Sequence, residues 1–169
     1  MQLSAPAKIN LTLDVLGRRA DGYHELCSIM QTVSLCDTVR VEAVRAAETA
    51  IAVKTDKGYL PADERNTAYK AAAAFLKAAG MTADIRIAIQ KRIPVGAGLG
   101  GGSADAAAVL RALDLLLHAG LTAEAMNQLA ASVGADVPFA LHGGCAVAEG
   151  IGDRLTHLPV MTELPMVLC

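Results

Sequence analysis

PVGAGLGGGSAD, from Pro94 to Asp105, is the stretch that decides the fold, and glycine occupies positions 96, 98, 100, 101 and 102 of it. A glycine backbone can approach an anion closely and aim successive N–H groups at it. A helix that begins near Ser103 would add its unpaired N–H groups and its partial positive charge. We therefore interpret the stretch as a phosphate-binding loop that opens a helix. The alternative, a flexible connector, is disfavoured because each glycine costs about 0.5–1 kcal/mol relative to alanine.

The predicted loop lies between a strand and a helix. Before it, Asp84–Arg92 alternates Ile85, Ile87 and Ile89 with polar or small residues, which is typical of a strand. After it, Ser103–His118 carries apolar residues at helical spacing. The chain thus runs strand, glycine loop, helix.

Two better-known glycine loops do not fit. Gly96, Gly98 and Gly101 satisfy GxGxxG, but a dinucleotide-binding fold needs a parallel strand after the helix. Here Thr122–Val133 predicts a second helix instead, with Thr122 as its cap and an acidic first turn. The other loop, GxxxxGK[ST], needs a lysine immediately before Ser103, where this chain has glycine.

The first half of the chain predicts sequential, mostly antiparallel strands and one helix. The strands are rich in apolar or β-branched residues and cover Ala7–Val15, Cys27–Leu35, Thr38–Val44 and Thr49–Val53. The first has Ile9, Leu11, Leu13 and Val15 on one face and is expected to be half-buried. Asp37 is interpreted as a break between two strands, and Asn66 and Gly80 as the two ends of an alanine-rich helix.

Composition limits the classes of function. A chain of 169 residues with 53% hydrophobic and 19% charged residues predicts one soluble globular domain. A net charge of -2 provides no basic field for a nucleic acid. The amino terminus reads as neither a signal peptide nor a membrane span, so a cytoplasmic location is expected. The cysteines lack zinc-site spacing and are expected to be reduced; they are Cys27, Cys36, Cys145 and Cys169.

Several motifs resemble a known family. PVGAGLGGGSADAA, beginning at Pro94, is similar to the second motif of the GHMP kinases, which include galactokinase, homoserine kinase and mevalonate kinase. Pro6–Leu11, Gly17–Leu26 (GRRADGYHEL) and Gly134–Phe139 (GADVPF) resemble one family among these, the 4-diphosphocytidyl-2-C-methyl-D-erythritol kinases. The resemblance spans nearly the whole chain.

The resemblance implies an α+β fold with a mostly antiparallel sheet and helices on one face, similar to the second domain of a ribosomal small-subunit protein. Residues 1–160 would form the amino-terminal ATP-binding domain, and residues 161–169 the start of a strand that leads to a second domain. The chain is thus expected to be an amino-terminal half with impaired turnover. LPMVLC, ending at Cys169, is interpreted as a buried strand whose open edge favours self-association, such as a homodimer.

The implied activity is ATP-dependent phosphorylation of the 2-hydroxyl of 4-diphosphocytidyl-2-C-methyl-D-erythritol, in the non-mevalonate isoprenoid pathway. Phosphoryl transfer depends on positioning, charge neutralisation and a group that orients the attacking hydroxyl. The resemblance assigns that group to Asp136 and pairs it with Lys8. Taken alone, Asp136 fits a turn aspartate equally well and Lys8 a solvated strand lysine.

The resemblance also assigns binding residues. Asn10, Tyr23 and His24 would hold the cytidine substrate, although an exposed loop histidine and a tyrosine over the core are the plainer interpretations. The ATP-binding set is Pro94, Val95, Gly96, Ala97, Gly98, Leu99, Gly100, Gly101, Gly102, Ser103, Asp105 and Asn66. Asn66 is equally a helix cap, with Thr67 after it. Mg²⁺ is expected with ATP and Ser103 near it, without a dedicated carboxylate ligand.

Two alternatives stay open at this point. One is another GHMP kinase, of the homoserine or mevalonate type, against which GRRADGYHEL argues. The other is a non-catalytic nucleotide-binding module on the same half-fold.

Overall fold

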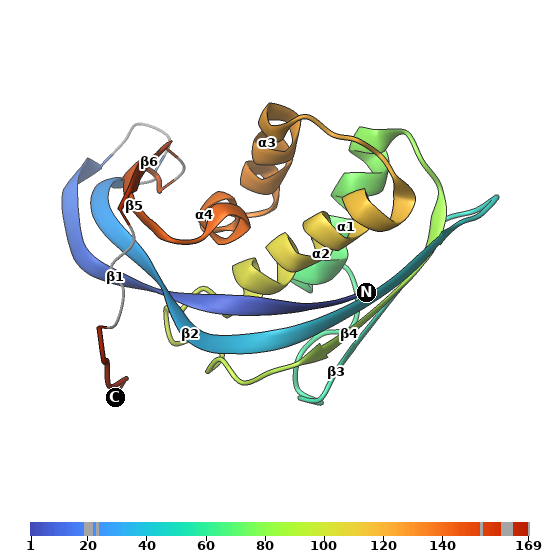
Figure 1. Cartoon of the computed structure of the whole chain (residues 1–169), viewed down its shortest axis with the longest axis horizontal. Coiled ribbons are helices and arrows are strands. Elements are labelled where there is room, and N and C mark those ends of the chain that lie inside the picture. Colours follow the sequence, from blue (N-terminus) through green and yellow to red (C-terminus); the bar gives the residue numbers. More distant parts are fainter. Residues whose placement is uncertain (19–21, 23, 153, 160–163, 169) are drawn as a thin grey trace.

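A six-stranded sheet carries a layer of helices on one face (Figure 1). The computed structural model describes residues 1–169 except 19–21, 23, 153, 160–163 and 169. The strands are β1 (Gln2–Arg18), β2 (His24–Arg45), β3 (Ala50–Thr55), β4 (Ala83–Gln90), β5 (Cys145–Gly150) and β6 (Arg154–Leu158). The helices are α1 (Thr67–Ala79), α2 (Gly101–Leu117), α3 (Ala123–Val133) and α4 (Val137–His142). The predicted α+β class, with a mostly antiparallel sheet, is confirmed.

The long strand β2 organises the sheet. It pairs antiparallel with β1 along one edge, while β5 and β4 share the other edge. The pairing with β5 ends at Gln31 and the pairing with β4 begins at Thr38. Among the strand pairs of the described residues, β3 and β4 alone run parallel. The segment of β2 between Gln31 and Thr38 therefore lies beside the point where the chain leaves β4 and enters the glycine loop.

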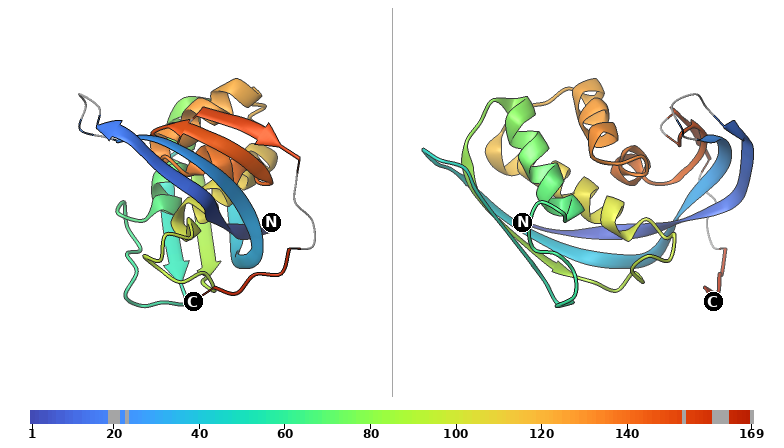
Figure 2. Two further views of the ribbon diagram at one scale, coloured as in Figure 1. Left: turned by 90° about the vertical axis from the view of Figure 1, so that its left-hand side faces the viewer. Right: turned by 180° about the vertical axis from the view of Figure 1, so that it is seen from behind.

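Helix α2 lies at the centre of the helix layer (Figure 2). Its alanines are buried, and Leu110 and Leu113 are fully buried with it in the core. Phe75 of α1 and Ile85 of β4 belong to the same hydrophobic cluster. Small side chains allow α2 to pack closely against its neighbours, so the residues at its first turn have fixed positions.

The predicted ends of α1 and the predicted cap of α3 are confirmed, whereas α2 begins at Gly101, two residues before the predicted start. The Asn66 side chain accepts a hydrogen bond from Ala68 N–H at 2.9 Å, and Gly80 ends α1 with a φ of 61°. Thr122 caps α3 by accepting from Ala125 N–H at 3.2 Å. These caps satisfy backbone groups that helix termini leave unpaired. Among the described residues, none of the helices has the length and apolar character that a membrane span requires.

The interpretation of Asp37 as a break between strands is wrong. β2 continues through Asp37, whose side chain is fully buried. Its carboxylate accepts hydrogen bonds from Arg92 N–H and Ile93 N–H and pairs with the Lys91 ammonium. On the edge of β2 that β5 and β4 share, no strand pairs with this segment, and the Asp37 side chain binds the residues after β4 there instead.

The expected half-burial of β1 is also wrong for its second half. Leu11, Leu13 and Val15 are 37%, 55% and 61% exposed, whereas Ala5 and Ala7 are buried. The strand continues beyond α2 as part of a curved arm with β2 (Figure 1). Register shifts in the β1–β2 pairing also interrupt the alternation of faces.

One prediction near the end of the chain is wrong as well, and another is confirmed. Asp136 lies in a turn directly before α4, as expected, although its side chain makes no cap hydrogen bond. Pro138 falls at the start of that helix, where its missing N–H costs nothing. The segment 164–168 forms no strand, and its Val167 is 88% exposed.

Replacing Asp37 with alanine should lower the free energy of unfolding by about 3–5 kcal/mol, because it leaves the Lys91 ammonium and two N–H donors without their acceptor. Urea unfolding followed by circular dichroism measures the loss. Glu42→Ala is the matched control, since Glu42 lies on the same strand in a surface pair with Arg40 worth at most about 1 kcal/mol. Equal losses in the two variants would contradict a structural role for Asp37.

Candidate functional site

The glycine loop borders a cleft of ≈ 340 Å³. Loop residues form one side of the cleft. The rest of its lining includes Leu60, Pro61, Arg65, Thr67 and Lys91. Every residue predicted to bind ATP lines this cleft: Pro94, Val95, Gly96, Ala97, Gly98, Leu99, Gly100, Gly101, Gly102, Ser103, Asp105 and Asn66. The structure thus brings the whole predicted set together around one space.

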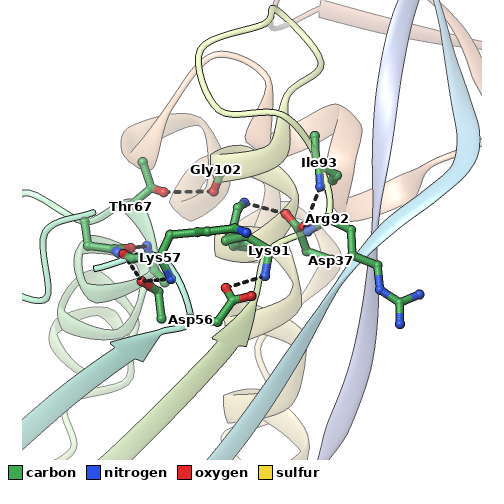
Figure 3. Close-up of polar contacts among 12 residues, drawn as sticks. Asp37, Asp56, Lys57, Thr67, Lys91, Arg92, Ile93 and Gly102 are labelled. Atoms are coloured by element: carbon green, nitrogen blue, oxygen red, sulfur yellow. Dashed lines mark hydrogen bonds and ion pairs between the residues drawn. The ribbon is translucent and has the colours of Figure 1, made fainter. Parts of the chain in front are cut away.

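Two helices begin at this cleft. α1 starts at Thr67 and α2 at Gly101, and the Thr67 hydroxyl donates to the Gly102 carbonyl at 2.9 Å (Figure 3). A Cβ on Gly102 would lie 3.1 Å from the Thr67 hydroxyl oxygen, so a larger residue would crowd this contact. Helix amino termini carry free N–H groups and partial positive charge. Their convergence makes the cleft suited to an anion.

The loop packs directly against β1. Lys8 N–H donates to the Leu99 carbonyl at 2.9 Å. Gly100 has a φ of +69°, and a Cβ there would lie 2.8 Å from Lys8 Cγ. Glycine is therefore needed at position 100 both for the backbone conformation and for the close approach of the Lys8 side chain.

A buried group of charges holds both ends of the loop, and we call Asp37, Lys91 and Asp105 the Lys91 cluster. The Lys91 ammonium pairs with Asp37 and lies 2.7 Å from Asp105 Oδ2 in α2. Asp37 Oδ1 accepts from Arg92 N–H at 2.5 Å and from Ile93 N–H at 2.8 Å (Figure 3). The cluster thus connects β2, the residues before the loop, and the helix after it.

The electrostatics of the cluster follow from its burial. Burial alone would lower the pKa of Lys91, but Asp105 and Asp37 outweigh it, so the Lys91 pKa is raised. Burial raises the pKa of Asp105 to about 7; the Asp37 carboxylate adds to the rise and the Lys91 ammonium offsets part of it. Asp105 is therefore a carboxyl group that titrates near neutral pH.

Asp37 and Lys91 were not predicted as site residues. The available signal was Asp37 standing between two apolar, β-branched segments that continue the same strand pattern. A charged residue in an unbroken strand pattern is buried at a cost and so indicates a specific partner.

Lys8 and Asp136 lie on the other side of the loop. Lys8 Nζ is 3.4 Å from Asp136 Oδ2, and the side chains are 12% and 31% exposed. Lys8 Nζ also donates to Asn10 Oδ1 at 2.7 Å. Asn10 in turn donates to the hydroxyl of the buried Ser28 at 2.5 Å, a contact that sequence reasoning missed. The structure thus joins three predicted residues, Lys8, Asn10 and Asp136, in one partly exposed polar group.

His24 stands apart from this group. It is exposed at the start of β2 and lines a separate hollow with Val15, Leu26 and Ile151. Along β2 it lies eight residues from the partner of Lys8, roughly 26 Å at strand spacing. Tyr23 lies outside the described residues.

Comparison with known proteins agrees with the motifs. The model of the GHMP kinases N-terminal domain matches residues 66–144, which include the loop and helices α1–α4. A protein of a Geobacter species named 4-diphosphocytidyl-2-C-methyl-D-erythritol kinase is 49% identical over 168 residues, 99% of this chain and 59% of its own length. A protein of the same name from Caldicellulosiruptor saccharolyticus is also 49% identical, over 99% of this chain and 57% of its length. The chain thus spans less than two thirds of these relatives.

Solved structures share the fold. A crystal structure of 4-(cytidine 5'-diphospho)-2C-methyl-D-erythritol kinase superposes with a TM-score of 0.77 and 46% identity, over 94% of this chain and 55% of that one. Homoserine kinase from Cytophaga hutchinsonii superposes with a TM-score of 0.71 and 24% identity, over 94% of this chain and 51% of that one. At this identity the similarity is evidence for a shared fold and not for a shared activity. The family resemblance read from the motifs is confirmed, and the chain carries a GHMP kinase N-terminal domain.

Proposed function

We propose that the chain is the ATP-binding part of a small-molecule kinase that phosphorylates the 2-hydroxyl of 4-diphosphocytidyl-2-C-methyl-D-erythritol. The observation that carries the proposal is the contact between Gly100 of the loop and Lys8, whose ammonium lies 3.4 Å from Asp136. A phosphate-binding loop and a carboxylate able to receive a proton thus share one lysine between them. A kinase needs these two functions side by side.

Each side chain then has a distinct task in the proposed transfer. The loop N–H groups and the first turn of α2 would hold the phosphates of ATP. Asp136, at 31% side-chain exposure, would orient the acceptor hydroxyl and take its proton. The Lys8 ammonium would neutralise charge on the phosphoryl group as it moves. Asn10 fixes the Lys8 ammonium through the 2.7 Å hydrogen bond.

The choice of substrate rests on the relatives that carry the same name and on GRRADGYHEL. We keep Asn10, Tyr23 and His24 as the proposed contacts to the cytidine part. His24 would then meet the substrate at the opposite end from the reacting hydroxyl. Homoserine and mevalonate kinases share only the fold with this chain and are the less favoured enzyme candidates.

Magnesium is proposed to bind together with the nucleotide. Among the described residues, no group of three or more His, Cys, Asp or Glu side chains is arranged to hold a metal. Asp105 lines the cleft, and one of its two carboxylate oxygens, Oδ2, is paired with Lys91. We therefore propose that magnesium arrives bound to the nucleotide, and we assign no step to a metal ligand of this chain.

The remaining assignments also stay proposals. Residues 1–160 would be the ATP-binding domain, and the segment from 161 would lead to a second domain. A cytoplasmic location and self-association as a homodimer are predicted from the sequence. A non-catalytic nucleotide-binding module is the second candidate function, which the Lys8–Asp136 contact disfavours.

Replacing Gly100 with alanine should weaken ATP binding at least tenfold, since the new Cβ would displace Lys8 and strain the loop. Isothermal calorimetry with ATP and magnesium measures the affinity. Gly120→Ala is the matched control, because Gly120 has a similar φ of +65° with nothing within 4 Å of an added Cβ. Equal affinity in both variants would argue against nucleotide binding in the loop.

Asp136→Asn should lower kcat about 10²–10⁴-fold, because the amide keeps the shape of the carboxylate but cannot take a proton. The assay follows transfer of labelled phosphate from ATP to 4-diphosphocytidyl-2-C-methyl-D-erythritol, homoserine and mevalonate. It uses this chain and a fusion of it to the part of the Caldicellulosiruptor relative beyond the aligned region. Asp84→Asn, at a partly exposed aspartate on β4, is the control. Turnover of the Asp136 variant within twofold of the parent would contradict the assigned role.

A further inference from the structure

Asp105 has one carboxylate oxygen that the fold does not use. Its Oδ2 lies 2.7 Å from the Lys91 ammonium, whereas Oδ1 is buried without a hydrogen-bond partner among the described residues. The residue is 4% exposed and lines the glycine-loop cleft. A buried carboxylate oxygen without a donor is costly, while a protonated one becomes a donor itself.

The charges around Asp105 do not balance when both aspartates are ionised. One ammonium, Lys91, serves two buried carboxylates, Asp105 and Asp37 of β2. Asp56, which follows β3, accepts the backbone N–H of Lys91 at 2.9 Å and supplies no positive charge. The cluster thus carries an excess of negative charge.

The other elements around the first turn of α2 do not remove this excess. From α1, the nearest group is the uncharged Thr67 hydroxyl, which is bonded to Gly102. Arg65 lines the cleft but is paired with Asp63. On β1, Lys8 lies on the far side of Gly100 and pairs with Asp136.

We propose that Asp105 takes part in nucleotide binding as a neutral carboxylic acid, so that a polyphosphate entering the glycine loop is accompanied by uptake of a proton at Asp105. Protonation removes the excess charge beside the incoming anion. It also gives the Asp105 carboxyl group, which lines the cleft, an O–H donor in place of a buried acceptor without a partner. This inference rests on the proposed binding of ATP in the loop and assigns Asp105 a specific chemical state there.

The direction of the pH dependence follows from the charges. In the free protein the pKa of Asp105 is raised to about 7, mainly by burial. A polyphosphate nearby disfavours the carboxylate and raises this pKa further. Above pH 7, Asp105 of the free protein has lost its proton and must regain it when ATP binds. The affinity for ATP therefore falls as the pH rises, by up to about tenfold per pH unit when one proton is taken up.

Calorimetry at pH 8 with ATP and excess magnesium chloride tests the proposal, because magnesium keeps the terminal phosphate ionised. The titration is repeated in buffers of different ionisation enthalpy, and the dependence of the heat on the buffer gives the number of protons taken up. The parent chain should take up close to one proton more than Asp105→Asn, which cannot be protonated. The control is Asp114→Asn on the same helix, where Asp114 Oδ1 accepts Leu121 N–H, a role that an amide oxygen can fill. This control should take up as many protons on ATP binding as the parent chain.

Equal proton uptake in the parent and Asp105→Asn would overturn the inference and leave the proposed function intact. Absence of binding heat at every pH between about 6 and 8.5 would overturn both. If Asp105→Asn does not fold, ¹³C NMR of the parent's aspartate carboxyl groups replaces it. One carboxyl should titrate near pH 7 and move to higher pH with ATP, and the absence of any aspartate titrating above pH 6 would contradict the inference.

Discussion

The glycine loop depends on the pairing of the Lys91 ammonium with the carboxylates of Asp37 and Asp105. This pairing connects strand β2, the end of β4 and the first turns of α2, at a point where β2 has β1 on one edge and no paired strand on the other. A buried ion pair adds little net stability compared with apolar packing, but it is costly to break. The main effect of this ion pair is to fix the residues on both sides of the loop. Asp37 holds Arg92 and Ile93 directly before the loop, and Asp105 holds the helix after it.

A second lysine supports the loop from the opposite side. A Cβ on Gly100 would meet Lys8 Cγ at 2.8 Å, and one on Gly101 would meet Lys91 Nζ at 3.2 Å. The start of α2 therefore lies between the side chains of two lysines, and the partial positive charge of the helix terminus adds to theirs. The two lysines differ in burial and partners. Lys91 is enclosed with carboxylates, whereas Lys8 reaches the partly exposed Asp136, so the first shapes the loop and the second is placed to act on a ligand.

Local signals predicted much of this arrangement. Glycine spacing identified the loop, alternation identified β4, and capping residues such as Asn66 and Thr122 fixed the helices within two residues. These features depend on residues close together in the chain. The role of Asp37 could not be read this way, because its partners lie 54 to 56 residues further on. The exposure of Leu13 likewise depends on where the helix layer ends, which strand alternation does not encode.

Backbone amide NMR distinguishes nucleotide binding in the glycine loop from binding elsewhere on the chain. In an ATP titration of the ¹⁵N-labelled chain, we expect the largest shift changes at the amides from Gly96 to Ser103. The amides around His24 and those of β4 around Arg86, whose side chain is 71% exposed, should stay unchanged. Saturable changes centred on either of those two regions, with the loop amides unaffected, would contradict binding in the loop.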